Sequence, residues 1–276
     1  MPADLHVHTV YSDGAYTPDD VITQCVARGV DTVAITDHDT VDGVIPTMEI
    51  GRRAGVRVVP GVEMTAYVDA TEIHVIGLFL YPDGGGLRPV IEGTRRTRGA
   101  RTERMVELLR RLDVDITLED VLRVANGGVP GRPHVARALI RCGAVSSVAE
   151  AFDRYIGNDG PAHVPKHLLS PAAAAAAIHR GGGVSIVGHP GVGLPDDLVR
   201  QVIADGAQGI EVYHPLNSPE QERSYLRMAQ ELKVLVSGGS DSHGTLREAT
   251  HIGAVRLDDG LVQQLEQRAR EIRQRP

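Results

Sequence analysis

Histidines and acidic residues recur in this sequence in short groups that could bind metal ions. The first group is Asp4-Leu5-His6-Val7-His8, in which the two histidines are two residues apart. Residues at this spacing on a β-strand point to the same face, so both imidazoles could bind one ion. Further groups follow at Asp13, Thr36-Asp37-His38-Asp39, Gly61-Val62-Glu63, His74, Gly188-His189-Pro190 and Ser240-Asp241-Ser242-His243.

One such group proves little alone, because a His-x-His pair is often ordinary packing and an aspartate before glycine is usually a turn residue. Six or seven predicted strand ends that all supply His, Asp or Glu indicate a metal site. The donors are nitrogen and oxygen without cysteine sulfur, which favours zinc, manganese or iron in an open site. The candidates outnumber the ligands of one ion, so we expect two or three divalent ions.

The elements that carry these residues alternate between strand and helix. Apolar, β-branched runs predict strands at residues 3–9, 32–36, 56–62, 73–80, 183–188, 209–213 and 234–237. Helical patterns lie at residues 18–28, 41–54, 171–180, 195–205, 219–231 and 260–273. This alternation is typical of an α/β fold with parallel βαβ units, in which active sites lie at the carboxyl ends of the strands.

One region breaks the alternation. No strand is predicted from Pro82 to Pro165, where helical patterns appear at residues 90–112, 118–124, 133–141 and 148–155. We expect residues 82–165 to form a helical insertion after the fourth strand, which caps a barrel made of residues 1–81 and 166–276 and forms the substrate pocket. The alternative is extra helical packing on the outside of the barrel.

The insertion is rich in arginine, with five arginines between positions 95 and 104. Arg98 and Arg101 share a helix face, and the planar guanidinium suits bidentate phosphate binding. Two further candidates begin a later helix, whose N-terminus could receive an anion. The alternative for each residue is an ordinary solvated side chain. The candidate substrate-binding residues are Arg98, Arg101, Arg132, His134 and Lys166.

Composition limits the partners. The 276 residues carry a net charge of −7, which argues against a broad nucleic-acid-binding surface but permits a small phosphorylated nucleotide or a short RNA end. The two cysteines, Cys25 and Cys142, are expected to be reduced. No apolar run reaches the length of a membrane span and no signal peptide is visible, so the expected compartment is the cytoplasm.

Together the motifs resemble the PHP family, the polymerase and histidinol phosphatase superfamily of metal-dependent phosphoesterases. The resemblance spans nearly the whole chain and implies a distorted seven-stranded (β/α) barrel that holds two or three metals. It also implies three ligand sets, of which the first two share Glu63. The first is His6, His8, Glu63 and Asp241, the second is Glu63, His74 and His189, and the third is Asp13, His38 and His243.

Within that family, the stretches Arg98–Arg104 and Gly131–Arg137 resemble the bacterial branch of 3′,5′-nucleoside bisphosphate phosphatases and 5′-3′ exoribonucleases. This implies hydrolysis of a small nucleotide's phosphate ester by metal-bound hydroxide. The candidate catalytic residues are Asp13, His38, His189 and His243. Alternatives are another small phosphomonoester such as histidinol phosphate, an amide substrate, or a non-catalytic regulatory module.

Several nearby residues are expected to support the ligands. Asp4, Asp37 and Asp39 are interpreted as groups that orient the metal-binding histidines. The sixth strand ends in Glu211-Val212-Tyr213-His214, and its two-residue period places Glu211 and His214 on opposite sides. We therefore expect at most one of them to face the site. His189 and His214 are both candidates to protonate the leaving group.

Overall fold

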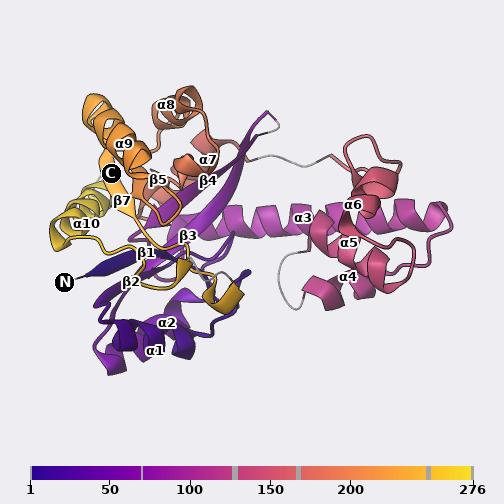
Figure 1. Ribbon diagram of the computed structural model, residues 1–276, viewed down its shortest axis with the longest axis horizontal. Coiled ribbons are helices and arrows are strands. Elements are labelled where there is room, and N and C mark those ends of the chain that lie inside the picture. The colour runs from indigo at the N-terminus through magenta and orange to yellow at the C-terminus, as the bar shows by residue number, and fades with distance from the viewer. Residues whose placement is uncertain (1, 70, 126–129, 166–168, 247–249, 275–276) are drawn as a thin grey trace. The chain divides into compact units, whose positions relative to one another are not determined.

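The computed structural model describes residues 2–69, 71–125, 130–165, 169–246 and 250–274 (Figure 1). The chain divides into two compact units, one of Met1–Ile91 with Leu169–Pro276 and one of Glu92–Leu168. The second unit begins ten residues later than the predicted insertion, at 92 rather than 82. The reason is that Leu87 and Ile91 pack into the apolar core of the first unit.

The first unit is built on a seven-stranded mixed sheet in the order β1 to β7. The predicted α/β fold class with seven strands is confirmed. Segments after β7 return to β1, where Val7 bridges Ser242 and Ala3 bridges Leu257, so the two edges of the sheet are joined. The strands are β1 (Ala3–Val7), β2 (Thr32–Ile35), β3 (Arg57–Val68), β4 (Thr71–Leu78), β5 (Val184–Val187), β6 (Gly209–Tyr213) and β7 (Leu235–Gly238).

Strand β4 departs from the predicted parallel arrangement. Strands β1, β2 and β3 are parallel, as are β5, β6 and β7, but β4 runs antiparallel to both β3 and β5. Its pairing with β3 extends from Gly61 opposite Leu78 to Val68 opposite Thr71. Only two residues connect these strands, and a parallel pair needs a much longer crossover. The expectation of parallel pairing was therefore wrong for β4.

Helices surround the sheet of the first unit (Figure 1). The predicted start signals act as caps: Thr17 and Asp20 form a capping box on α1, and Ser218 and Gln221 form one on α9. Apolar side chains from both strands and helices form the core. The helices are α1 (Pro18–Arg28), α2 (Val44–Ala54), α7 (Pro171–Arg180), α8 (Asp196–Ala204), α9 (Pro219–Leu232) and α10 (Asp259–Arg273).

The second unit is helical and contains no strand among its described residues, as predicted. Helix α3 starts in the first unit and continues into the second. A separate apolar core includes Met105, Leu109, Val121 and Leu139, all fully buried. No described helix is long and apolar enough to cross a bilayer. The helices are α3 (Arg88–Arg111), α4 (Leu118–Ala125), α5 (Arg132–Arg141), α6 (Val148–Ala151) and the π-helical turn Phe152–Ile156.

Candidate metal centre

All nine candidate metal ligands lie together in the first unit. His6 is on β1, Glu63 on β3 and His74 on β4, while the others follow β1, β2, β5 and β7 directly. Because neighbouring parallel strands end at the same edge of the sheet, residues far apart in sequence meet there. Backbone pairing fixes two of them closely, since His38 and Glu63 form an isolated bridge between their segments.

Glu63 is the centre of the cluster and contacts five imidazoles. Its side chain is 1% exposed, so these contacts are made away from solvent. Oε1 lies 2.8 Å from His74 Nδ1 and 3.0 Å from His189 Nε2. Oε2 lies 3.3 Å from His6 Nε2, 3.1 Å from His8 Nε2 and 3.2 Å from His38 Nδ1.

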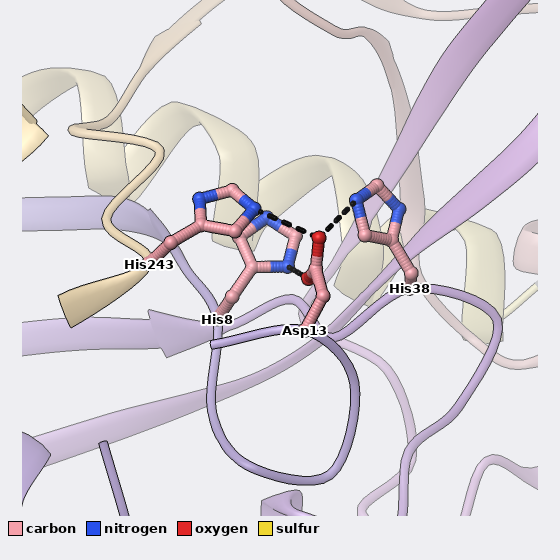
Figure 2. A group of neighbouring side chains, drawn as sticks. All are labelled: His8, Asp13, His38 and His243. Carbon is pink, nitrogen blue, oxygen red and sulfur yellow. Dashed lines mark ion pairs between the residues drawn. The ribbon is translucent and has the colours of Figure 1, made fainter. Parts of the chain in front are cut away.

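Asp13 is the centre of a second set of contacts and is half-exposed. Figure 2 shows its carboxylate between the rings of His38 and His243, with His8 beside it. Asp13 Oδ2 lies 3.2 Å from His243 Nε2 and 3.8 Å from His38 Nε2. Its Oδ1 lies 3.5 Å from His8 Nδ1. The turn after β1 thus places a carboxylate among three imidazoles.

Three groups have donor atoms close enough to share an ion. The groups differ from the sets implied by the family resemblance, because His8 belongs to two groups and His38 also lies beside Glu63. His189 belongs to one of the implied sets but to none of these groups. Its Nε2 lies 3.2 Å from Nδ1 of His74, which is grouped with His38 and Glu63. The groups are His6, His8, Glu63 and Asp241; His38, Glu63 and His74; and His8, Asp13, His38 and His243.

The ring nitrogens and carboxylate oxygens of the cluster are arranged to bind divalent cations rather than to hydrogen-bond with one another. Ring nitrogens face one another at 3.1 Å between His6 Nε2 and His8 Nε2. Within the described chain, His8 Nδ1 and Glu63 Oε2 are buried without a well-aligned hydrogen bond, although ionisable groups lie within 3.5 Å of both. Buried polar atoms without partners are costly, and a cation between them would satisfy several lone pairs together. The cluster therefore has the geometry and donor chemistry of a metal site.

The electrostatics of the cluster favour positive charge. Burial alone would lower the pKa of His8, but Asp241 and Glu63 outweigh it and raise the pKa to about 9. Burial is likewise outweighed at His74, where Glu63 raises the pKa to about 10. Burial dominates at His38 and lowers its pKa to about 3. At neutral pH the carboxylates thus attract either protons or metal ions.

Two of the predicted supporting aspartates, Asp37 and Asp4, accept hydrogen bonds from backbone amides, and Asp37 also accepts them from hydroxyl groups. Asp37 accepts hydrogen bonds from the Thr9 amide, the Thr9 hydroxyl and the Ser12 hydroxyl, each at 2.7 Å. Asp37 thereby fixes the turn that carries Asp13. Asp4 accepts bonds from the Ser240 and Gly253 amides, both at 2.8 Å, and so ties β1 to the segment that carries Asp241.

Glu211 and His214 both reach the cluster, so the expectation that at most one would do so was wrong. Glu211 Oε1 lies 2.9 Å from His6 Nδ1, and His214 Nε2 lies 3.7 Å from Asp241 Oδ2. The register of β6 with β7 shifts between Glu211 and Tyr213, which interrupts the two-residue period. A buried glutamate inside the apolar strand β6 was the available sequence signal for Glu211.

Four of the five candidate substrate-binding residues are described, and all four lie in the second unit. Arg101 donates from Nε to the Val164 carbonyl at 2.6 Å, and Arg132 donates to Asn158 Oδ1 at 2.9 Å. The Gly131 amide donates to His134 Nδ1 at 3.1 Å, which leaves Nε2 of the neutral ring as its N–H donor. Lys166 lies outside the described residues.

Positive charge gathers around two histidines of this unit. Burial and the charges of Arg137 and Arg98 lower the pKa of His134. Burial and the charges of Arg132 and Arg101 lower the pKa of His163, a residue that we had not singled out. Cations that lower the pKa of neighbouring histidines also attract anions. The second unit therefore carries a basic surface that includes four of the five candidates.

Comparison with known proteins agrees with this chemistry. The description "PHP domain" matches residues 4–122. The 5′-3′ exoribonuclease Rnm of Escherichia coli K12 is 32% identical over 87% of this chain and 84% of its own length. The 3′,5′-nucleoside bisphosphate phosphatase of Chromobacterium violaceum is 30% identical over 87% and 86%. A Bifidobacterium adolescentis structure, classed by inference as a metal-dependent phosphoesterase, is 33% identical over 96% of both chains, with a TM-score of 0.77.

Proposed function

The chain belongs to the PHP family and is a metal-dependent phosphoesterase, and from this premise we propose that it hydrolyses phosphate esters of small nucleotides. The preferred substrate is a 3′,5′-nucleoside bisphosphate, which loses its 3′-phosphate. A related activity is 5′-3′ exonucleolysis of short RNA. Both activities are those named for relatives that match 87% of this chain.

The observation that carries the proposal is the convergence of nine nitrogen and oxygen ligands around Glu63 and Asp13. We propose that they hold two or three ions of manganese, zinc or iron, with Glu63 shared between ions. Such ions, when bound, supply a water acidic enough to attack phosphorus near neutral pH and neutralise charge on the phosphate. The metal ligands are His6, His8, Asp13, His38, Glu63, His74, His189, Asp241 and His243.

The protein's own groups would then orient the phosphate. Asp13 and His38 are the ligands with the most exposed side chains, at 52% and 24%, so we propose that the phosphate enters beside them. The side chain of His214 is fully buried, so it does not reach a substrate that binds beside Asp13 and His38. The side chain of His189 is 18% exposed. Of the two, His189 is therefore the better candidate to stabilise or protonate the leaving oxygen.

The basic surface of the second unit supports a substrate with a second phosphate. Arg132 and His134 open helix α5, so a guanidinium and an imidazole can bind an anion together there. We propose that Arg98, Arg101, Arg132 and His134 bind a phosphate that is not cleaved. Binding energy from such a remote group can fix the orientation of the reacting ester.

A substrate panel tests the proposal. Purified enzyme loaded with Mn²⁺ would be given 3′-phosphoadenosine 5′-phosphate, a short 5′-phosphorylated RNA, histidinol phosphate and a small amide, with chelated enzyme as the control. We expect the largest kcat/KM for the bisphosphate or the RNA. Preference for histidinol phosphate would assign the first alternative, amide cleavage without phosphate release would assign the second, and no turnover at all would favour a non-catalytic module.

A further inference from the structure

Glu211 makes two contacts that each fix a proposed ligand. Its Oε1 accepts a hydrogen bond from His6 Nδ1 at 2.9 Å, and its Oε2 accepts one from the backbone amide of His189 at 2.7 Å. An ionised carboxylate can only accept, so His6 carries a proton on Nδ1, and its other ring nitrogen, Nε2, faces Glu63 and His8.

Glu211 is not itself a suitable ligand. Its side chain is 1% exposed, and both oxygens are already occupied by donors from His6 and His189. None of the three groups of donor atoms close enough to share an ion includes it. The carboxylate thus lies behind the cluster rather than in it.

His214 plays a comparable part toward Asp241. The backbone amide of Leu216 donates to His214 Nδ1 at 3.3 Å, which leaves the neutral ring with its proton on Nε2. That atom faces Asp241 Oδ2 at 3.7 Å, a distance at which the attraction is electrostatic. The contact leaves Asp241 Oδ1 beside His8 Nε2, at 3.2 Å.

The two loops held in this way have strained backbones. His189 has a φ of 25° and Asp241 a φ of 52°, in the region that residues with a side chain rarely adopt. Such conformations cost roughly 1–3 kcal/mol and persist only where the surroundings enforce them. Glu211 bonds the backbone of the first strained residue, and His214 faces the side chain of the second.

We propose that the carboxyl end of β6 supplies no metal ligand but holds two ligand-bearing loops in their binding conformation, with Glu211 and His214 as positioning residues. The inference rests on the metal role proposed above for the cluster. Its consequence is that β6 sets metal affinity. Removing Glu211 should affect the ions bound by His6 and by His189, while removing His214 should affect only the ion bound by Asp241.

The first experiment compares Glu211→Gln with the wild type in chelator competition for Mn²⁺ and Zn²⁺. The amide keeps the shape but has only one acceptor oxygen. Its NH₂ group must therefore face one of the two donors. We expect metal affinity to fall about 10- to 100-fold, as for other groups that orient metal-binding histidines. Glu220→Gln, which removes an exposed carboxylate from α9, is the control and should bind as the wild type does.

A second measurement separates positioning from simple structural support. Metal-free Glu211→Gln should keep the melting temperature of the metal-free wild type within a few degrees, whereas its Co²⁺-loaded form should show an altered visible absorption spectrum. Glu211→Asp, which keeps the charge, should recover part of the affinity. Equal metal affinity in Glu211→Gln and wild type would overturn the inference.

The third variant, His214→Asn, tests the other half of the proposal. We expect it to lose affinity for one ion per chain and to leave the remaining ions bound, as counted by elemental analysis. Loss of all ions, or of none, would contradict the role assigned to His214. A wild-type protein that binds no metal would instead refute the proposed function, so the two failures are distinguishable.

Discussion

At the scale of single residues, the cluster depends most on Glu63, whose two oxygens contact five imidazoles. Glu63→Gln replaces an acceptor-only group with one that must direct an NH₂ group toward histidine nitrogens. We expect kcat/KM to fall by at least about 100-fold, since loss of a shared ligand should exceed loss of an orienting group. Elemental analysis under saturating Mn²⁺ should find fewer ions than in the wild type.

A matched control for Glu63→Gln is Glu220→Gln, because it removes the same charge from an exposed helix position. The control should keep both activity and metal content. Wild-type metal content in Glu63→Gln would show that Glu63 is not a ligand. Fewer than two ions per chain in the wild type would contradict the multinuclear site itself.

Protons compete with metal ions for the histidines of the cluster, so metal affinity should depend on pH. His8 and His74 have pKa values of about 9 and 10 in the metal-free protein, above the ordinary value of 6.5, so at pH 7 an ion must displace their protons. Metal affinity should therefore rise with pH until the pH passes the higher of these two values, about 10. Isothermal titration with Mn²⁺ in buffers of different ionisation enthalpy would measure the protons released.

The stability of the metal-free protein, in contrast to its metal affinity, should fall as the pH rises. A histidine with a raised folded pKa contributes stability that is complete below about pH 6.5 and is lost as the pH rises through its folded value. The melting temperature of the metal-free protein should therefore fall between pH 7 and 10, and it should fall less with metal bound. A melting temperature of the metal-free protein that rises over this range would contradict the pKa shifts.

Sequence reasoning found the candidate ligands because metal chemistry restricts them to few residue types at strand ends. It did not resolve Glu211 and His214, because the two-residue period holds only while the strand is regular, and β6 shifts register between Glu211 and Tyr213. It also did not place His8 in two groups. Which ring nitrogen faces which neighbour depends on side-chain rotation, and spacing along the chain does not encode that.

At the scale of elements, the strands and helices of the first unit were predictable because their apolar runs and caps are local signals. The direction of β4 was not anticipated, although the two-residue connection after Val68 implied it. The reversal has a consequence for the site. His74 pairs with Thr65 in the middle of a long hairpin, so it reaches Glu63 from a strand rather than from a loop after one.

Helix α5 allows a prediction about substrate binding. Arg132→Ala removes a guanidinium from its first turn and should raise KM for a nucleoside bisphosphate about 10-fold or more, the equivalent of one charge-assisted hydrogen bond. Metal content should stay the same, because Arg132 belongs to the second unit and the ligands to the first. Steady-state kinetics and elemental analysis on the same preparation would measure both.

Arg123→Ala is the control for this variant, since Arg123 is an exposed arginine of α4 that pairs with Asp120 and Glu119. It should leave KM unchanged. Identical kinetics for Arg132→Ala and wild type would remove Arg132 from the substrate-binding residues.

At the scale of the whole molecule, each unit has its own apolar core, and the cluster of candidate metal ligands lies in the first. An ion that binds only the folded state stabilises it by about 4 kcal/mol at a free concentration 1,000 times its Kd. Chelation should therefore destabilise the first unit and leave the second nearly unaffected. Hydrogen exchange would show faster exchange in β1 and β3 and unchanged exchange in α4 and α5.

Equal loss of protection in both units would mean that they unfold as one cooperative body. A metal-independent exchange pattern would mean instead that the cluster does not contribute to stability. The prediction needs no substrate, so it can be tested before the activity is known.

The joining of β1 to the segment after β7 also has a consequence during synthesis. Ser242, which bridges Val7, and the neighbouring proposed ligands Asp241 and His243 are made 235 or more residues after His6. At about 5–20 residues per second, the first two histidines wait on the order of tens of seconds for their partners. A ribosome-bound chain therefore holds an unfinished centre over that interval, and full metal loading must wait until Asp241 and His243 have been made.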